Sequence, residues 1–94
     1  MAQHELTVPA TALRDRNSFE ILRVWIANGG QHVSLRAGLW EDPAAWGLML
    51  ADLARHIVNT YEPATASDRE QILERIKLGL IAELEAQTDA PPEK

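Results

Sequence analysis

The most informative stretch of the sequence runs from Phe19 to Trp40 and reads FEILRVWIANGGQHVSLRAGLW. Its two arms, residues 19–27 and 32–40, are rich in β-branched and aromatic residues, a composition that favours strands. Between them lies Asn28-Gly29-Gly30, and such residues supply the positive φ angles of tight hairpin turns. The stretch therefore predicts an antiparallel β-hairpin.

The register of this hairpin depends on which two residues form the turn. A loop centred on the two glycines would place Arg23 directly opposite Arg36. A loop centred on Asn28-Gly29 would instead place Trp25 opposite His32. Like charges that face each other across a strand pair are destabilising, so the second register is favoured.

Because side chains alternate along a strand, the hairpin has two different faces. We expect one face to pack against helices, and it carries Leu22, Val24, Ile26, Val33, Leu35, Ala37 and Leu39. The other face combines large apolar side chains with two guanidinium groups, a mixture that is enriched in interface cores. Its predicted interface residues are Phe19, Ile21, Trp25 and Trp40.

The sequence after the hairpin predicts two helices. Asp42 is a good N-cap ahead of Pro43, apolar residues then recur at helical spacing to Tyr61, and Pro63 ends the helix. A capping-box pattern, Ser67 with Glu70, predicts the start of a second helix that extends to about residue 86.

The ends of the chain carry weaker signals. Residues 1–17 form a poorly defined segment in which Leu6 and Val8 alternate with polar residues, which allows a short third strand at a sheet edge. Residues 88–94 are polar and contain two prolines, so a disordered tail is expected. The predicted fold is therefore α+β, with a single β-β-α-α domain over residues 18–87.

Composition excludes several classes of protein. The chain has 94 residues, which suits one domain, and its net charge of −5 argues against binding to nucleic acid. It has no cysteine, which excludes disulfides, thiolate nucleophiles and cysteine-based zinc sites. The sequence shows neither a secretory signal nor a stretch long enough to span a membrane, so a cytoplasmic protein without a membrane partner is expected.

The small size also predicts self-association. Without its two ends the chain keeps about 70 residues, a size at which one core seldom supplies more than ~3–5 kcal/mol. A lone two-stranded hairpin is marginally stable and leaves both its edges open. We therefore expect a homodimer in which hairpins pair edge to edge, with the helices covering one face of a four-stranded sheet. The alternative is that the N-terminal segment folds over the other face of the hairpin within one chain.

Few residues suggest chemistry. Asp52 and His56 lie four residues apart on the polar side of the first helix and can form a carboxylate–imidazole pair, although such exposed pairs are common. The other histidines, His4 and His32, lack the short spacing of zinc motifs. No motif combines a nucleophile, a base and an oxyanion site. We accordingly predict no catalytic residue, no metal site and no cofactor.

The group of most interest is formed by Arg23, Arg36, Trp25 and Trp40. Guanidinium groups beside indoles can bind a carboxylate, a phosphate or an exposed base, so these four residues are a candidate site for an anionic ligand. The alternative is a structural role, in which the arginines stack on aromatic side chains or pair with Glu20 or Glu41.

Two motifs in residues 19–62 resemble those of a family of small bacterial proteins that is classed as a domain of unknown function. One is the W-x-x-x-G-G turn formed by Trp25, Gly29 and Gly30. The other is the W-x-D-P-x-x-W segment, with Trp40, Asp42, Pro43 and Trp46. The resemblance implies no catalytic residues, because the family has no assigned activity.

Together these features predict a non-enzymatic, homodimeric interaction or regulatory module that binds a protein partner. The alternative function is a small domain that binds an anionic ligand through the arginine and tryptophan residues of the sheet.

Overall fold

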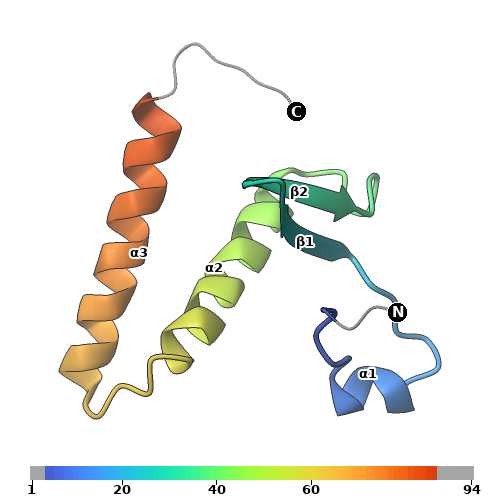
Figure 1. Ribbon diagram of the computed structural model, residues 1–94, viewed down its shortest axis with the longest axis horizontal. Helices are drawn as coiled ribbons and strands as arrows, with labels where there is room; N and C mark the ends of the chain where they lie inside the picture. The colour runs from blue at the N-terminus through green and yellow to red at the C-terminus, as the bar shows by residue number, and fades with distance from the viewer. Residues whose placement is uncertain (1–3, 87–94) are drawn as a thin grey trace. The chain divides into compact units, whose positions relative to one another are not determined.

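A computed structural model describes residues 4–86 (Figure 1). Along the chain the elements are α1 (Ala10–Arg14), β1 (Leu22–Ala27), β2 (Gly30–Leu35), α2 (Ala44–Asn59) and α3 (Ala66–Ala86). A two-stranded antiparallel sheet followed by two helices confirms the predicted α+β class.

The chain forms two compact units, which divide between Leu39 and Trp40. The hairpin belongs to the first unit, and α2 and α3 belong to the second. The expectation of one domain over residues 18–87, with helices packed on one sheet face, stays a prediction. The tail expected over residues 88–94 lies outside the described residues.

The hairpin adopts the favoured register, with Trp25 opposite His32. Its turn is formed by Asn28, with φ of 52°, and Gly29, with φ of 74°, as a two-residue hairpin turn with positive φ at both positions requires. This backbone conformation, rather than a turn at the two glycines, keeps Arg23 opposite Ser34 and away from Arg36.

Both strands are shorter than the sequence predicts. Beyond β2 the pairing continues only through the Arg36 N–H, which donates to the Ile21 carbonyl at 2.9 Å. Gly38 then has φ of 75°, a conformation that leaves the extended region. As a consequence Phe19 and Trp40 lie outside the strands.

The third strand that the sequence allowed near residues 6–8 is not present in residues 4–21. That part of the chain instead holds the short helix α1, which follows Pro9. Pro9 is the N-cap of this helix and has no backbone N–H to donate to a strand partner, which explains why the alternation of Leu6 and Val8 does not continue as a strand. After α1 the chain turns as Ser18 Oγ donates to the Ala12 carbonyl at 2.7 Å.

Helix α2 begins as predicted, because Asp42 Oδ1 accepts a hydrogen bond from the Ala44 N–H at 2.9 Å. The capping box of α3 was predicted two residues too late. Thr65 Oγ1 accepts from the Asp68 N–H at 3.0 Å, and Asp68 Oδ2 accepts from the Thr65 N–H at 3.3 Å. Thr65 with Asp68 and Ser67 with Glu70 both place a hydroxyl residue three positions before an acidic one. The first of these two pairs is the one that caps the helix.

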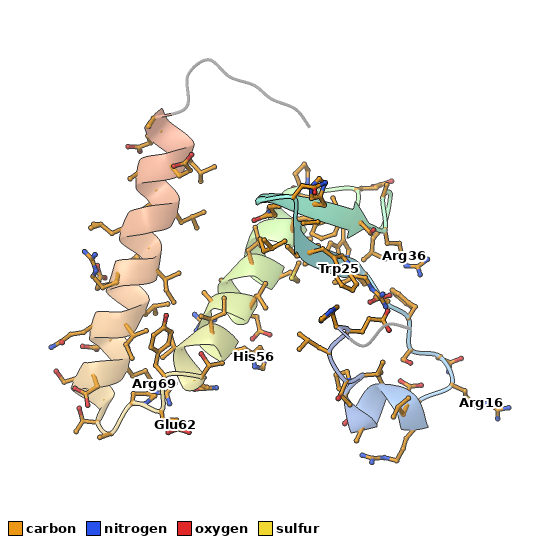
Figure 2. The ribbon with its side chains drawn as sticks, in the orientation of Figure 1. Arg16, Trp25, Arg36, His56, Glu62 and Arg69 are labelled. Atoms are coloured by element: carbon orange, nitrogen blue, oxygen red, sulfur yellow. The ribbon has the colours of Figure 1, made fainter. Side chains whose placement is uncertain are left out.

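The core of the helical unit lies where α2 and α3 meet near their connecting loop (Figure 1). Val58 of α2 is the one fully buried hydrophobic residue in the described part of the chain. In the first half of α3, Ile72, Leu73 and Ile76 are half-buried. Arg69 Nη1 donates to Asn59 Oδ1 at 2.7 Å and ties the helices together close to the loop (Figure 2).

From that loop α2 and α3 diverge (Figure 1). Side chains farther from the loop are correspondingly exposed, and Leu50, Leu80 and Leu84 are 48%, 51% and 70% accessible to solvent. Within residues 4–86 no helix combines the length and apolar character that crossing a membrane requires.

The turn can be tested with two glycines that both have room for a side chain but differ in the sign of φ. A Cβ atom added at Gly29 or at Gly79 would meet nothing within 4 Å, but only Gly29 has positive φ. Gly29→Ala should therefore lower the free energy of unfolding by about 1–2 kcal/mol. Gly79→Ala, within α3, should raise it by about 0.5–1 kcal/mol. Urea denaturation measures both values, and equal effects would contradict the assigned turn.

Candidate functional site

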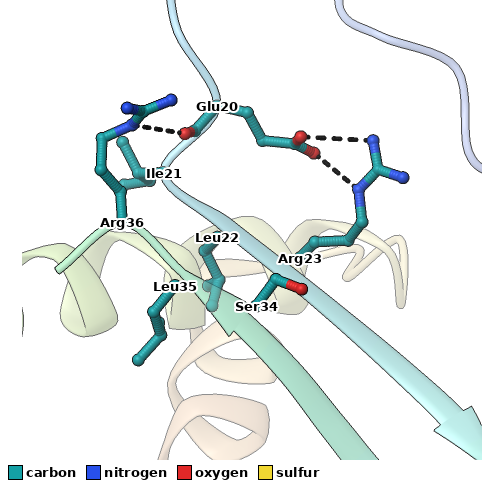
Figure 3. Close-up of a pocket in the computed structure, with 7 residues that line it drawn as sticks. All are labelled: Glu20, Ile21, Leu22, Arg23, Ser34, Leu35 and Arg36. Carbon is teal, nitrogen blue, oxygen red and sulfur yellow. Dashed lines mark hydrogen bonds and ion pairs between the residues drawn. The ribbon is translucent and has the colours of Figure 1, made fainter.

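The strongest polar cluster of the hairpin unit is centred on Arg23. Glu20 binds this guanidinium with both carboxylate oxygens, at 2.9 Å from Nε to Oε2 and 3.2 Å from Nη2 to Oε1 (Figure 3). Glu5, eighteen residues earlier, accepts a hydrogen bond from Nη1. The ion pairs hold the N-terminal segment against β1.

These two carboxylates stabilise the charged form of the guanidinium. The hydrogen bonds that Arg23 donates to Glu20, and after them the one that it donates to Glu5, raise the pKa of Arg23 above its ordinary value. Arg23 therefore keeps its positive charge, but the cluster of one guanidinium and two carboxylates carries a net charge of −1 when all three groups are ionised.

Arg36 is held by the same segment through different atoms. Its Nε donates to the backbone carbonyl of Glu20 at 3.0 Å, and its guanidinium lies over the ring of Phe19 at 5.1 Å from the centroid. Glu20 thus contacts both arginines, Arg23 through its carboxylate and Arg36 through its main chain (Figure 3).

An open hollow of about 480 Å³ lies between the two arginines. Residues from both strands and from the segment before β1 line it: Glu20, Ile21, Leu22, Arg23, Ser34, Leu35 and Arg36. Within residues 4–86 the two terminal nitrogens of Arg36 make no hydrogen bond, whereas all three nitrogens of Arg23 do.

The two tryptophans of the candidate site lie in different units. Trp25 is two residues after Arg23 on the same face of β1 and is half-buried. Trp40 belongs to the helical unit, where its ring packs edge-on against Trp46 with centroids 4.9 Å apart. Both arginines therefore contact Glu20. A ligand site that combines them with Trp25 and Trp40 stays a prediction.

The sequence could indicate some of these contacts but not all. The spacing of three residues between Glu20 and Arg23 and the adjacency of aromatic residues were visible, and both suggested the structural role. Glu5 gave no such signal, because an ion pair across eighteen residues depends on how the N-terminal segment folds back. Glu41, the other carboxylate considered, lies in the helical unit.

The Asp52–His56 pair forms as its spacing predicts, with 3.4 Å between His56 Nε2 and Asp52 Oδ2. Both side chains are more than 70% exposed, and His56 points away from α3 (Figure 2). His32 is engaged elsewhere, with Nε2 at 3.1 Å from the Ala27 carbonyl oxygen. Across residues 4–86 no cluster contains three or more side chains of the types that ligate metals.

Comparison with known families gives a match over most of the chain. The model of DUF5076, a domain of unknown function, matches residues 5–88. The chain belongs to this family. This confirms the resemblance that the tryptophan and glycine motifs suggested, and it adds no assigned activity.

A solved structure similar to this DUF5076 protein comes from the photosynthetic bacterium Rhodopseudomonas palustrus and is described as a "putative pyruvate dehydrogenase". The two chains are 29% identical, the TM-score is 0.72, and the match covers 99% of this chain and 95% of the other. They therefore share fold and length. None of the curated proteins that were compared matches the chain.

The link between Glu5 and Arg23 can be tested through the mobility of the N-terminal segment. Glu5→Gln removes a charged tether, so it should speed hydrogen exchange severalfold at the amides of Leu13 in α1 and of its C-cap Asp15. Salt at about 1 M should have the same effect on the wild type, since it shortens the Debye length to ~3 Å.

The matched control is Glu74→Gln, which removes the Lys77 ion pair on α3. It should leave exchange in α1 unchanged. Identical exchange in the Glu5 variant and the wild type would show that the ion pair does not hold the segment.

Proposed function

We propose that this DUF5076 protein is a non-enzymatic interaction module that functions as a homodimer. The supporting observation is an apolar patch on the second half of α3, formed by Leu80, Ile81 and Leu84, which we call the α3 patch. Their exposed fractions are 51%, 47% and 70%.

The α3 patch is continuous because residues three and four apart are neighbours on a helix. α3 is 21 residues long and has no buried residue, so a large part of its apolar surface has no cover among residues 4–86. Exposed apolar patches of this kind are typical of interaction sites.

A second copy of the chain is the partner that matches this surface. In a two-fold dimer the α3 patch of one copy packs against the α3 patch of the other. Apolar side chains then contact apolar side chains, and no second complementary surface is needed. Burying a half-exposed Leu or Ile contributes about 1 kcal/mol, and six such side chains in two copies give on the order of 6 kcal/mol. Association itself costs ~4–15 kcal/mol, so a stable dimer also needs surface from the hairpin unit.

The alternative function is binding of a small anionic ligand in the hollow beside Arg36. Its support is the pair of terminal nitrogens on Arg36, which have no partner among the described residues. The description of the similar bacterial protein points to pyruvate, which is a carboxylate. The carboxylates of Glu5 and Glu20 weaken this proposal, because they already occupy Arg23 and repel an anion.

Multi-angle light scattering tests the homodimer. Wild-type protein at micromolar concentration should have twice the 10.5 kDa mass of one chain. Leu84→Glu should raise the dissociation constant roughly tenfold or more, since the charge enters the interface twice. Ala82→Glu adds the same charge on the opposite side of α3 and should leave the mass unchanged. A monomeric wild type at every concentration would exclude the homodimer.

Thermal unfolding with phosphate and with pyruvate tests the alternative. A ligand that binds the native state raises the midpoint of unfolding. A rise that both Arg36→Ala and Arg23→Ala abolish would support the ligand site. If the midpoint still rises in both variants, the anion binds elsewhere. If the midpoint of the wild type does not rise, the ligand site is excluded and the interaction module remains as the proposed function.

A further inference from the structure

We propose that the outer edge of β1 is the seam at which two copies join, with the two β1 strands antiparallel and Val24 at the two-fold axis. The four strands would then run in the order β2-β1-β1-β2. This inference rests on the proposed homodimer and specifies which surface of the hairpin unit takes part.

The register of the hairpin determines which backbone groups are available at this edge. Residues that flank a two-residue turn form a hydrogen-bonded pair, and hydrogen-bonded pairs alternate along the ladder. Ala27, Trp25 and Arg23 therefore direct their N–H and C=O groups toward β2. The same groups of Leu22, Val24 and Ile26 point away from β2. Within residues 4–86 no backbone hydrogen bond joins them to another segment.

The side chains at this edge suit pairing with a copy of the same strand. Val24 and Ile26 are 50% and 74% exposed, and β1 is composed mainly of residues with high β propensity. An open, apolar edge strand is the feature through which sheets extend between chains.

Only one symmetric register uses the whole strand without a repulsive pair. With Val24 at the axis, Val24 faces its own copy, Leu22 faces the second copy's Ile26, and Arg23 faces the second copy's Trp25. Moving the axis to Arg23 would oppose two guanidinium groups, which is destabilising. Moving it to Trp25 would place Leu22 opposite the turn residue Asn28 and lose a ladder pair.

The contact of Arg23 with the second copy's Trp25 is compatible with the existing ion pairs. The bonds to Glu20 and Glu5 use the edge of the guanidinium, where its N–H groups lie. The flat face of the guanidinium is the part that stacks on an indole. One arginine can therefore hold the N-terminal segment and contact the second copy.

The outer edge of β2 is a poorer candidate. A symmetric pair about Val33 would place the polar Gln31 opposite Leu35 of the second copy. Moving the axis to His32 would oppose two imidazoles. The β1 edge has no such mismatch, so it is favoured over the β2 edge.

Cysteine cross-linking tests the seam directly, because the chain contains no cysteine. In the proposed register the Cα atoms of the two Val24 residues lie about 5.5 Å apart, within the range that a disulfide spans. The two Ile26 residues are offset by four positions, about 14 Å along the strands. The two Val33 residues are separated by three strand spacings, also about 14 Å.

Under mild oxidation Val24→Cys should form a covalent dimer, whereas Ile26→Cys and Val33→Cys should remain largely uncross-linked. Val24→Pro, which removes an outward N–H group, should reduce the mass measured by light scattering from two chains to one, and Val33→Pro should not.

Three outcomes would overturn the β1 seam but leave the homodimer standing. Cross-linking could be equal in all three cysteine variants, it could be strongest at Val33 or Ile26, or it could be absent from all three while the wild type is dimeric. A monomeric wild type would remove the homodimer itself, and the seam with it.

Discussion

The positive φ angles of Asn28 and Gly29 are the constraint on which the hairpin unit depends. A two-residue turn at these positions fixes the register, and a slip of one residue would reverse the face of every side chain in one strand. The turn therefore determines that Arg23 lies opposite Ser34 and not Arg36, and that the backbone of Leu22, Val24 and Ile26 points outward.

The register also explains why a single residue, Glu20, can organise the arginines. Glu20 comes just before β1 and Arg36 just after β2, so the two residues lie at the same end of the hairpin. The Glu20 carbonyl therefore reaches Arg36, and its carboxylate reaches Arg23. Glu5 adds a second carboxylate to Arg23. With Arg36 included, the two arginines and two carboxylates carry no net charge when all four groups are ionised.

Features that depend on neighbouring residues could be predicted from the sequence. The hairpin, its register and the start of α2 follow from turn and cap residues a few positions apart. Where two local signals competed the prediction was less accurate, as for the capping box at Thr65 that was expected at Ser67. The contact between Glu5 and Arg23 could not be predicted, because it joins segments that are distant in sequence.

Edge pairing through β1 would also resolve a weakness of the isolated unit. A two-stranded hairpin has two open edges, and the apolar β1 edge could pair with any extended chain. Pairing with a second copy closes that edge and leaves only β2 at the outside, where Gln31, His32 and Ser34 make the strand more polar. Stability and assembly are then a single equilibrium, since the buried surface that one copy lacks is supplied by the other.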